Sequence, residues 1–469
     1  MYRATIGLEV HAELRTKTKM FCSCKNDPDE EHPNVHICPI CLAHPGTLPV
    51  INREAVRHIL RVGGAIGGEL ATAFSEFDRK SYFYPDIPKG YQITQYEFPF
   101  VKGGMLNGVA ITRVHVEEDT ARSVHAKGKS LIDFNRAGVP LMELVTEPVI
   151  HDAETAGNFA RALQLLLRTL GAGEANLEKG EMRIEANISV SKTDAFGTKV
   201  EVKNINSFRS VERAIAFEIR RQSELLEAGG EVKQATRGWD EQKQETFHQR
   251  FKEGSADYRY FPEPDIPKLF LEEIEEFSVA ALRATLPELP WERQERYRAL
   301  GLTAPDALFM SSGFERGVFF DAIIAALGAD AALIKRAANY IVSDLAGLFA
   351  KKGKETYTQL TSDGFAKLIR ATAAGELSSR GAKDVLAIMV EKGGDPEVIA
   401  KEQGLLQVHD EEALEKVIAA VLAEETTAVA EYLAGKEAAL QYLIGKSMKA
   451  TKGAGNPALL KEIISKKLS

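Results

Sequence analysis

The stretch that decides the fold of the first part of the chain is Val109-Ala110-Ile111-Thr112-Arg113-Val114-His115-Val116. Its apolar residues tend to alternate with other side chains, which is the two-residue period of a strand that buries one face. Glycine, proline and asparagine interrupt the sequence often before residue 290, as the turns of a sheet require. We therefore expect a mixed or antiparallel sheet, with helices at 153–170 and 208–226 packed on it.

The composition changes near residue 290. After Pro287-Glu288-Leu289-Pro290 the sequence becomes rich in alanine, leucine, glutamate and lysine, with apolar residues at helical spacing. A turn-rich segment, Gly393-Gly394-Asp395-Pro396, marks a second break. The sequence therefore predicts an α+β chain, in which a sheet domain at 1–290 is followed by all-α domains at 291–395 and 396–469.

The length and composition are those of an ordinary globular protein. The 469 residues suffice for about three domains, and 44% are hydrophobic and 27% charged. No stretch approaches a membrane span, and the first ten residues lack the pattern of a secretory leader, so we expect a cytoplasmic location. The 67 acidic and 59 basic residues give a net charge of −8. Binding to nucleic acid would therefore require a local basic patch.

All four cysteines lie between residues 22 and 41, in the order C-x-C-x13-C-x2-C. Two thiolate pairs at the ends of a short loop are what a tetrahedral zinc site needs. Two disulfides or four buried free thiols are the alternatives, and a reducing compartment weighs against disulfides. We expect a structural zinc knuckle, because a site closed by four protein ligands leaves no position for a substrate. Its ligands would be Cys22, Cys24, Cys38 and Cys41.

A carboxylate and an imidazole lie side by side near the start of the chain. In Ala4-Thr5-Ile6-Gly7-Leu8-Glu9-Val10-His11 the two-residue period directs Ile6, Leu8 and Val10 to one face of a strand. Glu9 and His11 then share the opposite face. A carboxylate and an imidazole at this spacing can bind one cation together.

Two further carboxylates stand on apolar strand faces. Glu118 shares a face with Val114 and Val116, and Glu143 shares one with Leu141 and Val145. An ionised carboxylate on such a face is costly unless a cation or hydrogen-bonding partners compensate it. A shared Mg²⁺ or Mn²⁺ would suit oxygen ligands, and His11 favours a softer ion or a water-mediated contact. The alternative is that each carboxylate pairs separately with a basic residue, for which the nearby candidates are Arg113, Arg122 and Arg136.

Several common catalytic motifs are missing. Gly128-Lys129-Ser130 and Gly445-Lys446-Ser447 resemble the end of a P-loop, but Ser123 and Leu440 stand where the upstream glycine should be. The sequence also lacks G-x-S-x-G, H-E-x-x-H and a dinucleotide fingerprint between a strand and a helix. These absences disfavour the usual hydrolases, metalloproteases and dehydrogenases, so a nucleotide would need a less familiar site.

The end of the chain is basic although the whole chain is acidic. Between residues 446 and 469 six lysines accompany one acid, Glu462, which is a local charge of +5. A glycine-containing turn at 452–457 and a helix at 458–468 could hold RNA phosphates without reading bases. The alternative is the ordinary solvated face of a terminal helix. The six lysines are Lys446, Lys449, Lys452, Lys461, Lys466 and Lys467.

Long phrases in several parts of the chain resemble the GatB family, the B subunits of aspartyl/glutamyl-tRNA amidotransferases. The likeness runs essentially from end to end, with its phrases in order. They are Ile6-Gly7-Leu8-Glu9-Val10-His11, Cys38-Pro39-Ile40-Cys41-Leu42, Asp78-Arg79-Lys80-Ser81-Tyr82-Phe83-Tyr84-Pro85-Asp86, Pro88-Lys89-Gly90-Tyr91-Gln92-Ile93, His115-Val116-Glu117-Glu118-Asp119, Asp133-Phe134-Asn135-Arg136-Ala137-Gly138-Val139-Pro140-Leu141, Lys203-Asn204-Ile205-Asn206-Ser207-Phe208, Asp257-Tyr258-Arg259-Tyr260-Phe261-Pro262-Glu263-Pro264-Asp265 and Met448-Lys449-Ala450-Thr451-Lys452-Gly453.

This resemblance implies a catalytic cradle domain, a helical domain and a YqeY-like tail that binds tRNA. It implies a heterotrimer with an amidase subunit, GatA, and a small subunit, GatC. The implied reaction is a step of protein biosynthesis that uses ATP to phosphorylate the side-chain carboxylate of Glu, or Asp, on misacylated tRNA-Gln, or tRNA-Asn. Ammonia then displaces phosphate, which makes the assembly a carbon–nitrogen ligase with glutamine as amido-N-donor. The sequence lacks an amidase-type Lys-Ser-Ser motif, so we expect a partner subunit to hydrolyse glutamine.

The resemblance also implies roles for individual residues and cofactors. Its magnesium site falls on Glu9, His11, Glu118 and Glu143, the positions that the strand period had already singled out. Lys80 matches a cradle lysine and is the candidate for binding ATP phosphate. The family phrase M-R-C-D-A-N reads Met182-Arg183-Ile184-Glu185-Ala186-Asn187 here, so Glu185 keeps an acidic group on a longer side chain. The expected cofactors are ATP, Mg²⁺ and a structural Zn²⁺.

Two other functions remain possible at this stage. One is a non-catalytic, zinc-stabilised tRNA-binding subunit, for which the zinc knuckle and the basic tail suffice. The other is an independent metal-dependent phosphatase or nuclease. Only the amidotransferase subunit would couple ATP turnover to the presence of glutamyl-tRNA.

Overall fold

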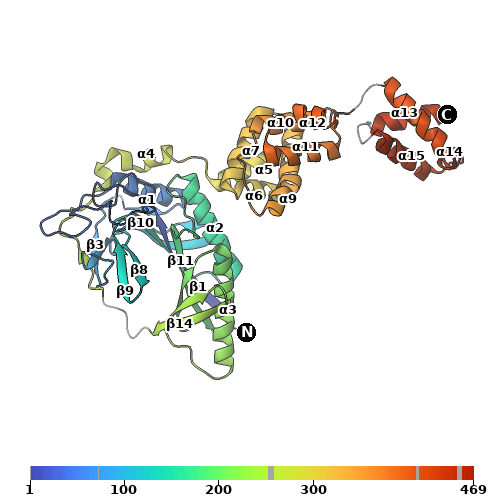
Figure 1. Ribbon diagram of the computed structural model, residues 1–469. Helices are drawn as coiled ribbons and strands as arrows, with labels where there is room; N and C mark the ends of the chain where they lie inside the picture. Colours follow the sequence, from blue (N-terminus) through green and yellow to red (C-terminus); the bar gives the residue numbers. More distant parts are fainter. Residues whose placement is uncertain (1, 72, 252–257, 408–410, 452–456, 469) are drawn as a thin grey trace. The chain divides into compact units, whose positions relative to one another are not determined.

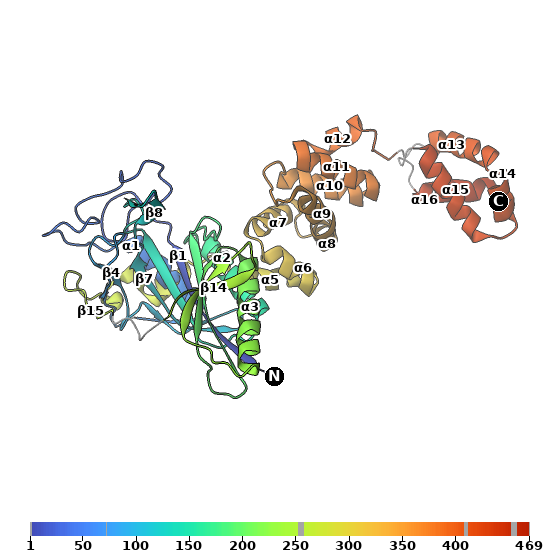
Figure 2. The same ribbon diagram turned by 60° about the horizontal axis from the view of Figure 1, so that its bottom comes forward.

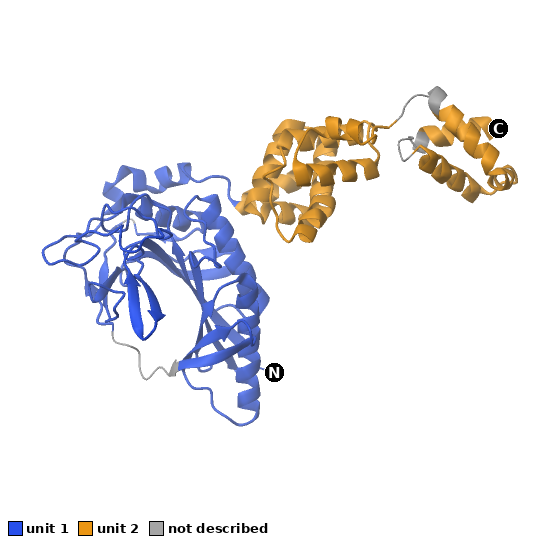
Figure 3. Cartoon of the chain, in the orientation of Figure 1, with its two compact units in different colours: residues 1–289 blue, residues 290–469 orange. Residues whose placement is uncertain are grey.

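The computed structural model describes residues 2–71, 73–251, 258–407, 411–451 and 457–468. The chain divides into two compact units, Met1–Leu289 and Pro290–Ser469 (Figure 3). The first unit combines sheets with helices, and the described part of the second unit is helical (Figure 1). These observations confirm the predicted α+β class.

One large sheet forms the centre of the first unit. Its strand order is β14-β13-β12-β11-β1-β10-β7-β5-β2, with β6 beside β7. Neighbouring strands are antiparallel except β12 and β13, which are parallel, so the sheet is mixed as predicted. The strands are β1 (Arg3–Glu13), β2 (Glu69–Leu70), β5 (Val101–Lys102), β6 (Met105–Leu106), β7 (Val109–Glu118), β10 (Pro140–Thr146), β11 (Met182–Ser191), β12 (Val200–Ile205), β13 (Ala235–Asp240) and β14 (Glu245–Phe251).

Two smaller sheets accompany the large one. A three-stranded sheet joins β3 (Asp78–Ser81), β4 (Tyr91–Thr94) and β15 (Phe261–Pro262). A hairpin of β8 (Arg122–Ala126) and β9 (Lys129–Asp133) is inserted between β7 and β10. In the first, β4 packs beside β7 (Figure 2), and the second connects the end of β7 to the start of β10.

Three long helices cover one face of the large sheet (Figure 1). They are α1 (Arg53–Ala65), α2 (Ala153–Thr169) and α3 (Phe208–Glu227), and the last two match the predicted helices to within one residue at each end. A side chain caps the free N–H groups in the first turn of each helix. The capping residues are Asn52 for α1, Asp152 for α2 and Ser207 for α3. Two 3₁₀ turns at Leu271–Glu273 and Glu275–Phe277 and the helix α4 (Val279–Ala284) complete the unit.

The core between helices and sheet fixes which side of β1 is polar. Ile6, Leu8 and Val10 are essentially inaccessible and belong to one hydrophobic cluster with Phe159 of α2 and Val211 of α3. The intervening residues of β1 are only partly buried. The opposite face of the sheet is therefore free to carry polar groups, as the sequence pattern predicted.

The second unit contains two separate hydrophobic cores. The first is built by α5 (Pro290–Ala299), α6 (Ala304–Ser311), α7 (Phe314–Leu327), α8 (Ala331–Asn339), a π-helical segment (Tyr340–Leu345), α9 (Ala346–Lys352), α10 (Ser362–Ala373), α11 (Ser379–Lys392) and α12 (Pro396–Glu402). The second is built by α13 (Glu411–Glu424), α14 (Thr426–Leu433), α15 (Glu437–Ala450) and α16 (Pro457–Leu468).

The position of α12 corrects the predicted break at residues 395–396. Ile399 and Ala400 are buried in the core of α5–α11, and a bridge between Leu377 and Leu406 continues this association. The glycines that suggested a domain boundary instead end α11, where Gly393 and Gly394 take positive φ angles before the helix cap Asp395. Among the described helices, none is both long and apolar enough to cross a membrane.

Candidate functional site

Three neighbouring strands align polar side chains across the face of the sheet opposite the three long helices. His11 of β1 lies directly opposite Glu143 of β10, and Glu143 lies opposite His115 of β7. Glu117 follows His115 by two residues, so it projects to the same side. The strand register therefore brings the side chains of residues 11, 115, 117 and 143 to one place.

His11 is the centre of this group. Its Nε2 lies 3.3 Å from Glu143 Oε2, 3.5 Å from Glu117 Oε1 and 3.8 Å from Glu9 Oε1. Glu185 of β11 lies directly opposite Glu9 and offers an oxygen within 4.8 Å of the Glu9 and His11 ligand atoms. We refer to Glu9, His11, Glu117, Glu143 and Glu185 as the His11 cluster.

Burial and mutual repulsion shift the pKa values in the His11 cluster. Burial, with the charges of Glu143 and Glu185, raises the pKa of Glu9 to about 7. Burial likewise raises the pKa of Glu117. For His11, burial acts downward, but the hydrogen bond to Glu143 and the surrounding carboxylates raise its pKa to about 9. The carboxylates thus crowd one site and require positive charge, which a divalent cation bound to these oxygens would supply.

Lys80 brings a cation from a different sheet. Its strand β3 pairs with β4, and β4 is tied to β7 by the Thr94 hydroxyl, which donates to Glu117 Oε2 at 3.1 Å. The ammonium lies over the rings of Tyr258 and Tyr82, at 4.9 and 5.9 Å from their centroids. Burial opposes its charge, but Glu117 and Glu143 nevertheless raise the pKa of Lys80 above its ordinary value. Lys80 therefore stays charged beside the His11 cluster.

Glu118 does not join the His11 cluster, contrary to the predicted ligand set. Its carboxylate forms an ion pair with Lys89 and accepts the backbone N–H of Ile93 at 3.0 Å. Because consecutive residues of a strand project to opposite faces, its neighbour Glu117 occupies the place that the sequence assigned to Glu118. The alternative of a separate ion pair is thus correct for Glu118, although with a lysine rather than an arginine.

Glu185 occupies the edge of the His11 cluster. Its Oε2 lies 2.7 Å from Lys203 Nζ of β12. Arg183, two residues earlier on the same face, lies opposite His11 and forms an ion pair with Asp119 at 3.1 Å. Glu185 is therefore close enough to share a cation with Glu9 and His11, but it already has a lysine partner.

Sequence reasoning missed His115 and Glu117. Both are almost completely buried, and His115 Nε2 lies 3.5 Å from Glu143 Oε2. Burial lowers the pKa of His115 to about 4, so this imidazole is neutral near pH 7. Arg113, at 3.4 Å from Glu143, completes the row. The alternation of residues 113, 115 and 117 against Val114 and Val116 was the available signal.

The four cysteines meet in the long loop between β1 and α1. Their sulfur atoms lie within 4.8 Å of one another, and all four are free thiols. The Cys38 N–H donates to Cys41 Sγ at 3.1 Å, and a hydrogen bond from Cys22 lowers the pKa of Cys41 to about 5. Four convergent thiols with backbone N–H donors fit a tetrahedral metal such as zinc. The four free thiols do not form the two disulfides that the sequence left open as an alternative.

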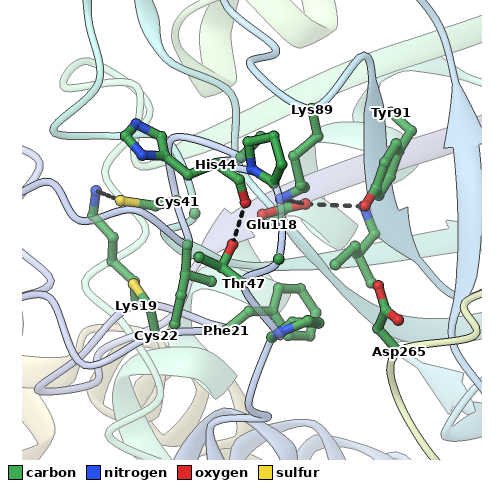
Figure 4. Close-up of a pocket in the computed structure, with 17 residues that line it drawn as sticks. Lys19, Phe21, Cys22, Cys41, His44, Thr47, Lys89, Tyr91, Glu118 and Asp265 are labelled. Carbon is green, nitrogen blue, oxygen red and sulfur yellow. Dashed lines mark hydrogen bonds and ion pairs between the residues drawn. The ribbon is translucent and has the colours of Figure 1, made fainter.

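A buried lysine and a cavity adjoin the cysteine cluster (Figure 4). Lys19 is inaccessible to solvent, with its Nζ 3.0 Å from the Phe134 carbonyl and 4.0 Å from Cys41 Sγ. The cavity measures about 230 Å³ and is lined by Lys19, Cys41, Lys89 and Glu118 among others. Its lining includes Glu118 but no member of the His11 cluster, so the cavity and the cluster are distinct features.

The predicted basic patch falls on α15 and α16, which share one core. Lys449, Lys461 and Lys466 are exposed. Lys446 pairs with Glu425 at 2.5 Å and Lys467 with Glu415 at 3.4 Å. Lys452 lies outside the described residues. The patch is thus less uniformly positive than the sequence indicated.

Comparisons with known proteins agree along the whole chain. A family model described as the GatB/GatE catalytic domain matches residues 4–275, and one described as the GatB domain matches residues 319–468. The B subunit of the aspartyl/glutamyl-tRNA(Asn/Gln) amidotransferase of Thermus thermophilus is 45% identical, over 99% of this chain and 98% of that protein. The corresponding protein from Thermomicrobium roseum is 44% identical over 100% and 99%, and that from Crocosphaera subtropica 40% over 100% and 98%.

Proposed function

Because the chain belongs to the GatB family of aspartyl/glutamyl-tRNA(Asn/Gln) amidotransferase B subunits, we propose that it carries the ATP-dependent step of the reaction. Its substrate is the side-chain carboxylate of Glu, or Asp, attached to tRNA-Gln, or tRNA-Asn. The product is the corresponding amide, still esterified to the tRNA.

Direct attack of ammonia on a carboxylate would have to expel oxide, which is a very poor leaving group. In the proposed step a carboxylate oxygen attacks the γ-phosphorus of ATP, the bond to ADP breaks, and an acyl phosphate forms. Ammonia then attacks the acyl carbon, inorganic phosphate leaves, and one proton is released. Phosphoryl transfer needs alignment and charge neutralisation more than covalent help from the protein.

The single observation that carries this proposal is the convergence of His11, Glu117 and Glu143 beside the half-buried cation of Lys80. His11, Glu117 and Glu143, with Glu9 at 3.8 Å from His11, are the residues that would hold Mg²⁺. When bound, the ion would neutralise phosphate charge. Lys80 is the side chain suited to a phosphate oxygen, because its ammonium remains charged despite burial.

The remaining partners follow from the chemistry. The relatives are named as one component of an amidotransferase with several subunits, which supports an assembly with an amidase subunit and a small subunit, GatA and GatC. The amidase would release ammonia from glutamine, and the present chain would use it. Free ammonia should therefore replace glutamine when the amidase is inactive. The cysteine cluster would hold a structural zinc, and the exposed lysines of α15 and α16 would contact tRNA phosphates.

The test uses the chain purified with its partner subunits, glutamyl-tRNA-Gln, ammonia and ATP. ADP formation and glutaminyl-tRNA should appear together, and both should require the charged tRNA. Glu143→Gln should reduce both by about 100-fold or more. Glu147→Gln, which alters a half-buried carboxylate just beyond the same strand, is the control and should retain most activity.

Two results would favour other functions. If Glu143→Gln leaves amide formation intact, the chain is the non-catalytic zinc-stabilised RNA-binding subunit. If ATP is consumed equally well without charged tRNA, the chain is a metal-dependent phosphatase or nuclease.

A further inference from the structure

The β8–β9 hairpin is an insertion between the two strands that carry the central carboxylates. β7 ends one residue after Glu117, and β10 begins three residues before Glu143. Between them the chain leaves the large sheet, forms the hairpin over residues 122–133 and returns. In Figure 1 no helix lies over this ribbon. Its base is therefore fixed at the border of the His11 cluster.

The hairpin is exposed on both faces. All residues from Arg122 to Leu131 are exposed. Val124 and Leu131 form a cross-strand pair and still have 50% and 57% of their surface accessible. A two-stranded hairpin without a covered face is marginal in water by itself, so this one needs support from elsewhere.

The loop that carries the cysteines provides that support. Asn34 donates its backbone N–H to Asp133 Oδ1 at 3.0 Å and accepts the Phe134 N–H at 2.8 Å. The buried side chain of Asn135 accepts the N–H groups of Val35 and His36, each at 2.9 Å. The Arg122 guanidinium donates to the Pro28 carbonyl at 3.2 Å. The 22–41 loop therefore holds the base of the hairpin, while its outer part remains free.

Every residue of the hairpin that carries a full charge between residues 122 and 132 is basic. Arg122 lies at the base and Lys127 and Lys129 lie at the outer end, and this segment has no acid although the chain has a net charge of −8. Within the described residues neither Lys127 nor Lys129 forms an ion pair. At the turn, Lys127 and Gly128 have φ angles of 50° and 72°, and Asn, Asp or Gly is normally preferred at the first of these positions. A lysine thus occupies a position that the backbone geometry disfavours.

We propose that the β8–β9 hairpin contacts the phosphate backbone of the tRNA substrate near its aminoacylated end. This inference rests on the proposed function, because the amino acid must reach the His11 cluster and the adjoining RNA must then pass the base of the hairpin. Each strand has five residues, about 16 Å of reach at the usual rise per residue. A polyanion matches a ribbon with three cations and no acid, and phosphate contacts need no exposed base edges.

The test replaces the two unpaired lysines with Lys127→Gln/Lys129→Gln in the chain purified with its partner subunits. Binding of unacylated tRNA is measured against salt concentration, together with the kcat and KM for glutamyl-tRNA. The control is Lys199→Gln/Lys233→Gln, which removes the same charge from exposed positions before β12 and β13. For the hairpin variant we expect tRNA binding to weaken and KM to rise by about 5-fold to 20-fold, with kcat nearly unchanged. The slope of log K against log salt should become shallower by about 1 to 2, while the control stays like the parent.

Equal losses in both variants, or an unchanged salt slope, would overturn the proposal. Loss of the partner subunits during purification, with tRNA binding intact, would overturn it in favour of a protein-docking role. Because binding of unacylated tRNA is measured without turnover, it can succeed even if no amide is formed. In that case the proposed function would fail while the assignment of the hairpin would stand.

Discussion

Glu117 and Glu118 are consecutive residues of β7, but their carboxylates lie in different surroundings. Glu117 Oε1 lies 3.5 Å from His11 Nε2, whereas Glu118 pairs with Lys89 and the Ile93 N–H. The alternation of side chains along a strand separates them. Only the first is available to the His11 cluster.

This difference predicts opposite outcomes for two matched substitutions. Glu117→Gln should lower ATP-dependent amide formation by about 100-fold or more, since it removes a charge at the reaction site. Glu118→Gln should chiefly reduce stability, because it weakens a buried ion pair. Steady-state kinetics and thermal unfolding of both variants provide the check. Comparable kinetic defects with unchanged stability would show that the assignment of the two residues is wrong.

Lys80 should act on ATP. Lys80→Met removes the cation that β3 contributes to the surroundings of the His11 cluster and should lower kcat/KM for ATP by about 100-fold. Lys102→Met alters an exposed lysine of β5 and serves as the control. An ATP dependence for Lys80→Met equal to that of the control would exclude a phosphate-binding role.

The sequence predicted the face of β1 correctly, but of the two glutamates of β7 it selected Glu118, whereas the structure brings Glu117 to His11. Ile6, Leu8 and Val10 are buried while Glu9 and His11 face the other side, because alternation within one strand needs no knowledge of its neighbours. Glu117 and Glu118 both lie at the end of their strand, and both are buried. Alternation along β7 places them on opposite faces. Which of the two faces meets His11 is decided by the pairing of β7 with β10 and by the position of Lys89, and these contacts depend on the tertiary fold.

The cysteine cluster predicts a measurable metal. The purified protein should contain about one zinc per chain, and Cys22→Ser should lose it. Metal analysis and limited proteolysis of the 22–41 loop test this, with the exposed Ser23→Ala as the control. A metal-free protein with a protease-resistant loop would contradict the zinc assignment.

Lys19 should stabilise the same cluster. Its buried ammonium offsets thiolate charge near Cys41 and donates to the Phe134 carbonyl, so Lys19→Met should weaken zinc retention in competition with a chelator. It should also cost about 1–3 kcal/mol in the free energy of unfolding, because the Phe134 carbonyl loses its charged donor. Lys17→Met changes an exposed lysine two residues away and should have little effect. Equal zinc retention in the two variants would refute this role.

The compact cysteine pattern could be recognised from spacing alone, whereas the contribution of Lys19 could not. A zinc loop brings its own ligands together over 20 residues, but Lys19 is buried by Phe134 and Gly138, which are more than 100 residues away. In the lysine patch of α15 and α16, contacts with distant residues instead weaken a feature that the sequence predicted. Counting lysines overestimated the positive patch, because Glu425 and Glu415 lie earlier in the chain and pair with Lys446 and Lys467.

The most direct test of the central claim follows oxygen from the substrate carboxylate. Glutamyl-tRNA carrying ¹⁸O in the side-chain carboxylate is converted by the assembled complex with ATP and ammonia, and the released phosphate is analysed by mass spectrometry. If the His11 cluster supports phosphorylation of that carboxylate, each amide formed should deliver one ¹⁸O atom to inorganic phosphate, and Glu117→Gln should suppress both products together. Amide formation with unlabelled phosphate would contradict the account.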